Sequence, residues 1–225
     1  SNRAFVAEIS KLKVEYEYRE VPGAHTFAYW KANVRYSLSR QIEAFAKAKP
    51  PEPGSAPAGS AKVAIVIDDL GSRRDTVESF LALGVPMTFA VIPREKHSRE
   101  LAERVRAAGQ TVLLHLPMEP LSYPRDDPGQ GALYVSLSPE EIRRRVDKFL
   151  ADVPGIAGVN NHMGSKFTED EFGMRVVLER LKAARLFFLD SRTSEKSCGP
   201  RVARELGVPV AQNQFFLDVS TQPAD

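Results

Sequence analysis

Two adjacent aspartates, Asp68 and Asp69, follow the apolar run Val63–Ile67 and are the residues of this chain best suited to chemistry. The run is mostly β-branched and predicts a strand buried on both faces. Ligands of α/β proteins bind at the carboxyl ends of such strands. Two carboxylates in that place need a cation or a hydrogen-bond network. A pair of solvated loop acids or helix caps is the plainer alternative, which this stretch alone leaves open.

Polar side chains also stand at the ends of the later predicted strands. They are His115 after 111–114, Asn160-Asn161-His162 after 156–159, Asp190 after 186–189 and Asp218 after 215–217. The carboxyl ends of parallel strands share one edge of a sheet, so these residues are expected to converge on one site. Two histidines opposite a double aspartate favour a metal centre over buried structural histidines.

The predicted metal centre combines one aspartate of the pair with His115 and His162. Mixed histidine and carboxylate ligation with an open position is typical of catalytic zinc, and other first-row divalent ions also suit it. The metal would acidify a bound water and polarise a carbonyl oxygen. The remaining aspartate would then serve as the general base.

Further polar residues are expected around this centre. Asn161 and Ser165 could orient the ligands or bind substrate. Asp190 or Asp218 could accept a hydrogen bond from a metal-binding histidine. Arg192 could bind an anionic group or pair with Asp190.

Strand and helix signals alternate from Lys62 onward. Repeated βα units predict a mainly parallel sheet, either doubly wound or closed as a barrel. Ser98, Ser138 and Thr168 are the expected helix caps. The long segment Leu116–Leu137 is expected to be a functional loop. The other predicted strands are 87–91 and 208–211, and the helices are 73–83, 98–108, 139–151, 169–184 and 201–206.

Composition divides the chain into three parts. Residues 1–48 predict a small N-terminal α+β segment, the Pro/Gly/Ser-rich residues 49–61 a linker, and residues 62–225 the main domain. A net charge of +2 gives no reason to expect nucleic acid as a partner. The single cysteine, Cys198, excludes an internal disulfide, and no apolar run is long enough to cross a bilayer. The oligomeric state is left open.

Five motifs together resemble the divergent polysaccharide deacetylases, a bacterial family related to the nodulation-factor and chitin deacetylases. The motifs are I-D-D-L-G (67–71), M-T-F-A-V-I-P (87–93), L-L-H-L-P-M-E-P (113–120), N-N-H-M-G-S (160–165) and F-F-L-D-S-R-T (187–193). The resemblance covers the predicted domain from Lys62 to about Asp218. It implies an α/β fold, a deformed (β/α) barrel of six to seven parallel strands, and a divalent metal, usually zinc.

The resemblance also implies roles for individual residues. Asp68 matches the general base and Asp69 the metal ligand. The wider superfamily takes both histidine ligands from one H-x-x-x-H motif, but here His115 matches the first and Glu119 stands at the second. His162 is the expected replacement. Members of this branch usually continue through a further strand bearing a general-acid histidine, and no histidine follows His162 in this chain.

The expected function is a metal-dependent hydrolase that removes N-acetyl groups from an amino-sugar polysaccharide. Its partner would be that polysaccharide, and the resemblance implies a periplasmic or cell-envelope location. Two alternatives stay open. One is a non-catalytic carbohydrate- or envelope-binding protein on a deacetylase scaffold, which the missing late histidine would favour. The other is a metal-dependent amidase acting on a non-sugar amide.

Overall fold

The computed structural model describes residues 63–214 and 216, of which Ile65–Leu81 and Pro86–Gln214 form one structural unit. The predicted N-terminal segment and linker, residues 1–61, lie outside the described residues. The same holds for Asp218 and, apart from Phe216, for the predicted strand at 215–217. No helix in the described part of the chain is both long and apolar enough to span a membrane.

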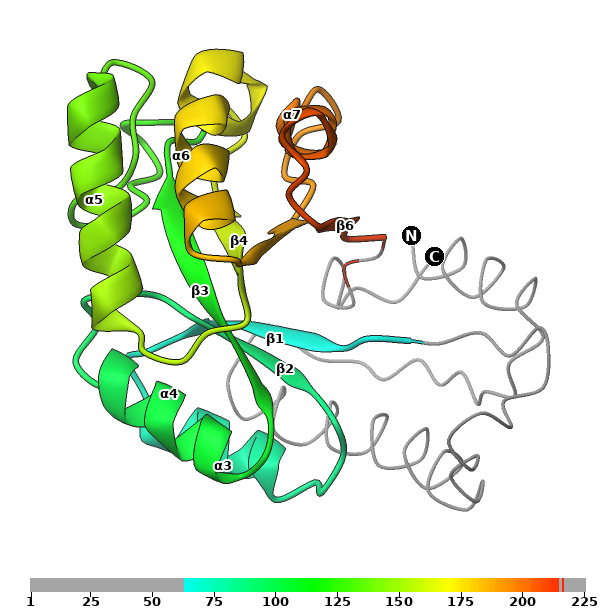
Figure 1. Cartoon of the computed structure of the whole chain (residues 1–225). Helices are drawn as coiled ribbons and strands as arrows, with labels where there is room; N and C mark the ends of the chain where they lie inside the picture. The colour runs from blue at the N-terminus through cyan, green and yellow to red at the C-terminus, as the bar shows by residue number, and fades with distance from the viewer. Residues whose placement is uncertain (1–62, 215, 217–225) are drawn as a thin grey trace, which may run out of the picture. The chain divides into compact units, whose positions relative to one another are not determined.

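The described residues form one sheet of six parallel strands, paired in the order in which they occur in the sequence (Figure 1). The strands are β1 (Val66–Leu70), β2 (Thr88–Val91), β3 (Thr111–Met118), β4 (Gly158–Met163), β5 (Phe187–Asp190) and β6 (Val210–Gln212). A doubly wound sheet reverses its strand order at a switch point, and this sheet does not. The fold is therefore α/β and barrel-like, but not closed. The six parallel strands of the described residues agree with the predicted deformed barrel of six to seven parallel strands.

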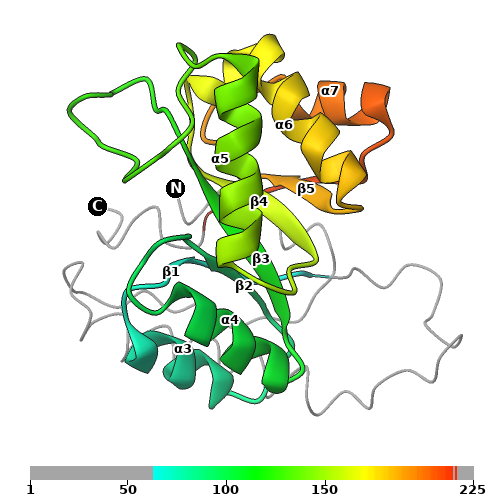
Figure 2. The same ribbon diagram turned by 60° about the vertical axis from the view of Figure 1, so that its left-hand side comes forward.

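Amphipathic helices connect successive strands. They are α3 (Arg74–Leu81), α4 (Ser98–Ala107), α5 (Pro139–Asp152), α6 (Glu171–Ala183) and α7 (Gly199–Leu206), with a short 3₁₀ helix, η1 (Phe167–Glu169), before α6. In Figure 2, α4 and α5 lie in front of the strands that they connect. Helix α5 buries Ile142, Val146 and Phe149, a spacing that puts apolar residues on one helical face. The side of the sheet under the helices is thus the hydrophobic core.

Strands β3 and β4 extend farther than their apolar residues predict. Pairing continues from Leu113↔Gly158 through His115↔Asn160 to Met118↔Met163, so His115 and His162 lie within strands rather than after them. Leu116, predicted to open the long loop, is likewise part of β3. The polar residues remain part of the strands because the hydrogen bonds between strands are made by backbone N–H and C=O groups, which do not depend on the side chain. The loop therefore begins at Glu119.

Two of the predicted helix caps are wrong. Ser138 does cap α5, because its hydroxyl accepts a hydrogen bond from the Glu141 backbone N–H. Ser98 is instead the first residue of α4 and donates its hydroxyl to the Ile92 carbonyl at 2.6 Å. Asp170 caps α6 in place of Thr168, which hydrogen-bonds to the Gly164 carbonyl. In both cases a nearby carbonyl offered the hydroxyl a competing partner.

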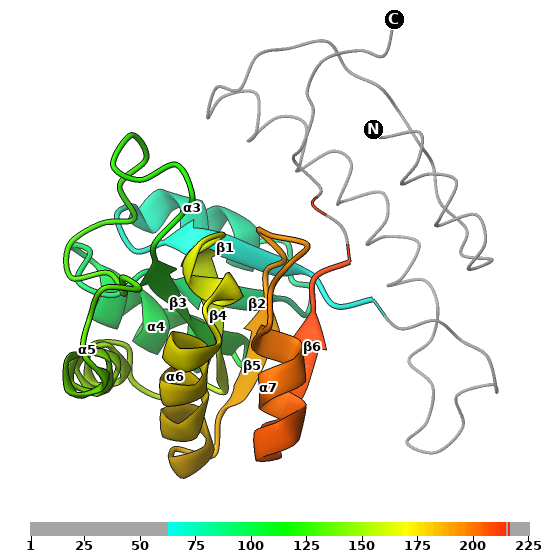
Figure 3. The ribbon, with the colours of Figure 1, turned by 90° about the horizontal axis from the view of Figure 1, so that it is seen from above.

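Figure 3 shows the sheet from above, with α6 and α7 beside β4, β5 and β6. Strands β3 and β4 lie in the middle of the strand order, and their residues Leu113, Leu114, Leu116 and Val159 are fully inaccessible. The polar side chains of these two strands are held by a rigid frame. This frame positions the candidate site.

Candidate metal centre

Asp69 lies in an irregular part of β1. The pairing register with β2 shifts between Ile67 and Leu70, which marks a bulge, and Asp69 has a left-handed backbone (φ 55°). A bulge next to an active site redirects a side chain, and a left-handed aspartate costs about 1–3 kcal/mol that the surrounding fold must offset. A regular strand would point two adjacent side chains to opposite faces. In this irregular stretch, carboxylate oxygens of Asp68 and Asp69 lie 3.9 Å and 3.1 Å, respectively, from His115 Nε2.

His115 and His162 come from neighbouring strands and the same face of the sheet. His115 pairs with Asn160, and Pro117 pairs with His162, so the two histidines are offset by two residues along the strands. Residues two apart on a strand point to the same side. Their rings meet edge to face, with centroids 4.9 Å apart.

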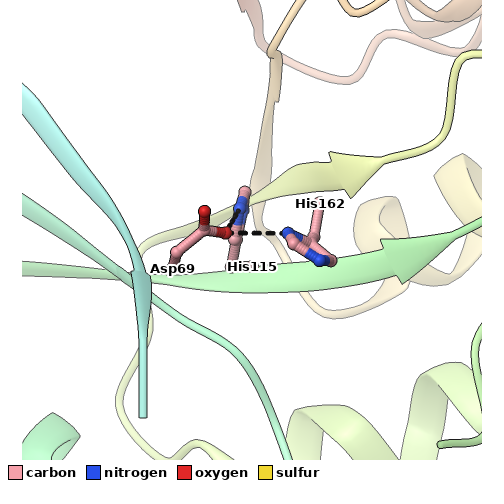
Figure 4. A group of neighbouring side chains, drawn as sticks. All are labelled: Asp69, His115 and His162. Atoms are coloured by element: carbon pink, nitrogen blue, oxygen red, sulfur yellow. Dashed lines mark hydrogen bonds and ion pairs between the residues drawn. The ribbon is translucent and has the colours of Figure 1, made fainter. Parts of the chain in front are cut away.

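One oxygen of Asp69 contacts both imidazoles (Figure 4). Asp69 Oδ1 is 3.1 Å from His115 Nε2 and 2.8 Å from His162 Nδ1. The ligating atoms of the three residues all lie within 4.8 Å of one another. Three side chains from β1, β3 and β4 therefore converge as the strand-end argument predicts.

The two imidazoles stabilise the ionised form of Asp69. Hydrogen bonds, first from His115 and then from His162, together with their Coulomb attraction, hold the pKa of the Asp69 carboxyl well below its usual range, although partial burial acts in the opposite direction. An ionised carboxylate accepts hydrogen bonds or binds a cation and cannot donate.

The three residues fit a divalent metal. One carboxylate oxygen and two imidazole nitrogens are borderline ligands of the kind that zinc and other first-row ions accept. The ligands also differ in exposure: the His115 side chain is 3% exposed, whereas that of Asp69 is 65% exposed. A metal held here would be fixed from the buried side and open to ligands from the solvent side.

Asp68 stands beside this group without belonging to it. Its Oδ2 is 3.9 Å from His115 Nε2, beyond hydrogen-bonding distance, and its side chain is 48% exposed. One carboxylate of the double aspartate thus contacts both imidazoles, and the other lies next to them.

Glu119 and Ser165 have structural partners. Glu119 is buried, and its carboxylate accepts from Lys166 Nζ at 2.7 Å and from the Val135 backbone N–H at 2.9 Å. The Ser165 hydroxyl accepts from the Leu121 backbone N–H. Both contacts tie the loop after β3 to neighbouring segments. Nothing in the sequence signals a role for Lys166, because its contact with Glu119, 47 residues earlier, depends on the fold.

Asn161, Asp190 and Arg192 organise the end of β5. The Asn161 amide accepts from the Ser191 backbone N–H and donates to the Met163 carbonyl. Asp190 is fully buried and accepts from the Arg192 backbone N–H, with no hydrogen bond to either imidazole. The side chain of Arg192 is exposed, so Arg192 pairs with Asp190 through its backbone.

Backbone strain gathers at the same edge of the sheet. Among the described residues, five non-glycine residues have a positive φ, and four of them, Asp69, Arg94, Met163 and Arg192, lie in or just after β1, β2, β4 and β5. Such conformations persist where the fold imposes them and cluster at functional sites. Their position supports a site at the carboxyl edge by an observation independent of the ligand geometry.

Comparison with known proteins gives the same family as the five sequence motifs. The family model described as divergent polysaccharide deacetylase matches residues 65–225. The chain belongs to this family. Its five motif segments each span the carboxyl end of one strand from β1 to β5, which explains why motifs far apart in sequence belong to one site.

Two curated relatives share this similarity. The uncharacterized protein YibQ of Escherichia coli K12 is 40% identical over 171 residues, which is 76% of this chain and 53% of that protein. An uncharacterized protein of Haemophilus influenzae is 35% identical over 164 residues, 73% of this chain and 58% of that protein. The chain thus spans little more than half the length of these relatives.

A solved structure supports the fold. The crystal structure of the uncharacterized protein ATU2773 from Agrobacterium tumefaciens C58 superimposes with a TM-score of 0.68 at 23% identity, covering 73% of this chain and 67% of that one. At this level of identity the similarity concerns the fold. The barrel-like architecture of this deacetylase family member is therefore shared with an experimentally determined structure.

The ionised state of Asp69 predicts a pH dependence of stability in metal-free protein. Because the folded-state pKa is below the unfolded value of about 3.9, the stabilisation is complete above that value and is lost as pH falls through the folded pKa. Urea unfolding in the presence of chelator should be measured from about pH 6 to about pH 2, a range that contains the unfolded pKa of aspartate. Over this range the free energy of unfolding should fall more in wild type than in Asp69→Asn. Equal losses would contradict the contact with the imidazoles.

Proposed function

We propose that this protein is a metal-dependent deacetylase that hydrolyses the N-acetyl groups of an amino-sugar polymer of the cell envelope. One observation carries the proposal: a carboxylate and two imidazoles converge at the carboxyl edge of the sheet, with a second carboxylate beside them. Membership of the divergent polysaccharide deacetylase family supports the reaction class. We also propose that the protein acts in the periplasm or cell envelope, where such polymers lie.

The residues divide the work between them. Asp69, His115 and His162 hold the metal, which we propose to be zinc. A bound zinc ion supplies Lewis-acid chemistry, polarising the amide carbonyl and acidifying a water molecule. Asp68 takes a proton from the attacking water as the general base. Its exposure and its distance of 3.9 Å from His115 Nε2 leave it close to the metal ligands and open to solvent.

The loop after β3 supplies a surface suited to a sugar ring. Tyr123 and Tyr134 meet edge to face with centroids 5.0 Å apart, and both Tyr123 and Leu121 are exposed. A tyrosine offers an apolar ring that can pack against the C–H face of a sugar, and a hydroxyl that can hydrogen-bond to the hydroxyl groups of the sugar. Because Ser165 binds the Leu121 backbone N–H, this loop is tied to the segment directly after His162. The exposed aromatic and apolar side chains of this loop favour a glycan over a small amide as the substrate.

Acetate release tests the proposal directly. The zinc-loaded chain should release acetate from N-acetylglucosamine oligomers or peptidoglycan fragments, lose the activity in chelator and regain it with added zinc. Simple non-sugar acetamides should be poor substrates. If they are cleaved in preference to the glycans, the substrate is a non-sugar amide and the protein is an amidase. Glycan binding without acetate release from any substrate would contradict a catalytic role and favour a binding protein.

A further inference from the structure

Three buried side-chain atoms in the described part of the chain have no hydrogen-bond partner: His115 Nδ1, Asn160 Oδ1 and Asp190 Oδ2. The first two belong to the proposed metal ligand His115 and to its neighbour on β4. His115 and Asn160 are directly paired residues on β3 and β4, so their side chains project from the same face of the sheet side by side. Both residues are about 2% exposed. Unpartnered buried polar groups cost about 1–3 kcal/mol each, and two such groups on paired residues call for one explanation.

The orientation of the Asn160 amide follows from its neighbours. The Ser191 hydroxyl donates its hydrogen to the Asn161 carbonyl at 2.8 Å. Toward Asn160, Ser191 Oγ can then only accept, so the amide group that faces it at 3.3 Å must be the Nδ2 donor. This fixes Nδ2 toward Ser191, which follows β5, and turns Oδ1 away from it. On the side of β4 opposite β5, the residue paired with Asn160 is His115.

The hydrogen on the His115 ring has to change nitrogen when a metal binds at Nε2. His115 Nε2 lies 3.1 Å from Oδ1 of the ionised Asp69 and must carry the hydrogen of that contact. In a neutral imidazole Nδ1 is then an acceptor, and Asn160 Oδ1 is also an acceptor. Two acceptors cannot form a hydrogen bond. A metal ligand at Nε2 requires the other tautomer, with the hydrogen on Nδ1.

We propose that Asn160 is a positioning residue for the metal centre. In the metal-loaded protein, Asn160 Oδ1 accepts a hydrogen bond from His115 Nδ1–H and so holds Nε2 in the ligand tautomer. A continuous chain of hydrogen bonds then runs from His115 through Asn160 and Ser191 to the backbone of Asn161. The inference rests on the proposed metal centre and adds to it the residue that selects the tautomer.

Zinc affinity is the first test, measured by competition with a chromophoric chelator on wild type and three variants. Asn160→Leu keeps the size but removes the acceptor, and should weaken zinc binding about 10–100-fold, as loss of a ligand's hydrogen-bond partner typically does. Asn160→Asp keeps an acceptor and should bind within about threefold of wild type. Ser191→Ala removes the partner of Nδ2 but leaves the acceptor Oδ1 in place, so it should weaken zinc binding less than Asn160→Leu does.

Imidazole ¹⁵N NMR supplies a readout that a merely structural role would not move. In wild type, the His115 hydrogen should move from Nε2 to Nδ1 when zinc is added. The Nδ1 signal should carry the signature of a donated hydrogen bond, which Asn160→Asp preserves. Urea unfolding of each metal-free variant separates zinc affinity from stability. Should Asn160→Leu fail to fold, the wild-type and Asn160→Asp spectra still decide.

The outcomes that overturn the inference are distinct from those that overturn the function. A folded Asn160→Leu with wild-type zinc affinity, or zinc-loaded wild type with the His115 hydrogen on Nε2, would remove Asn160 from this role and leave the metal centre intact. Wild type that binds no zinc would overturn both, because the ligand group itself would then be wrong.

Discussion

His162→Ala is expected to lose zinc, whereas Glu119→Gln is expected to keep it. His162 Nδ1 lies 2.8 Å from Asp69 Oδ1 and is one of three ligating side chains. Removing a ligand should weaken zinc binding by more than the about 100-fold that loss of a supporting partner can cost. His115→Ala should behave in the same way. Metal content by elemental analysis after dialysis, and the zinc Kd by competition, measure the effect.

Glu119→Gln is the matched comparison because Glu119 occupies the place of the second histidine in H-x-x-x-H. Its carboxylate already accepts from Lys166 and from the Val135 backbone N–H. A glutamine can keep one of these contacts, so the variant should lose stability, on the order of 1–3 kcal/mol. Its zinc content should match wild type. Zinc lost in Glu119→Gln but retained in His162→Ala would mean that Glu119, not His162, is the third ligand beside Asp69 and His115.

The sequence reveals the site because parallel sheets bring the carboxyl ends of distant strands together. Asp69, His115 and His162 are separated by up to 93 residues, yet each follows or ends an apolar run, and the structure brings their ligating atoms within 4.8 Å. The number and direction of the strands follow from the same alternation of apolar runs and helices. The resemblance to the deacetylase family suggests the roles of these residues, but their convergence follows from the topology of the sheet.

Other features depend on contacts that a sequence does not display. Backbone pairing continues through the polar residues of β3 and β4 and sets the length of both strands. His115 therefore lies inside β3, although its polar side chain predicts the end of that strand. The bulge at Asp69 depends on how β1 meets β2. The role proposed for Asn160 depends on its register with His115, whereas the sequence singled out the neighbouring Asn161. Pairing register, which is a long-range property, accounts for each of these differences.

The largest expected effect on catalysis comes from Asp68→Asn. The substitution keeps the size and shape of the side chain and removes the proton acceptor. General bases contribute about 10²–10⁴-fold to the rate, so kcat for acetate release should fall by that factor. Because Asp68 Oδ2 is 3.9 Å from His115 Nε2 and outside the ligand group, zinc affinity should stay near that of wild type.

Asp69→Asn provides the contrast, since the same chemical change one residue later should remove a metal ligand and so reduce zinc affinity as well as activity. The two variants would then distinguish the roles of the adjacent aspartates. A change in kcat alone identifies a proton acceptor, and a change in both zinc Kd and kcat identifies a metal ligand. An Asp68→Asn variant with full activity would exclude Asp68 as the base. One that loses zinc would show that both carboxylates bind the metal, and the bulge in β1 would then serve to bring the pair to one ion rather than to divide it.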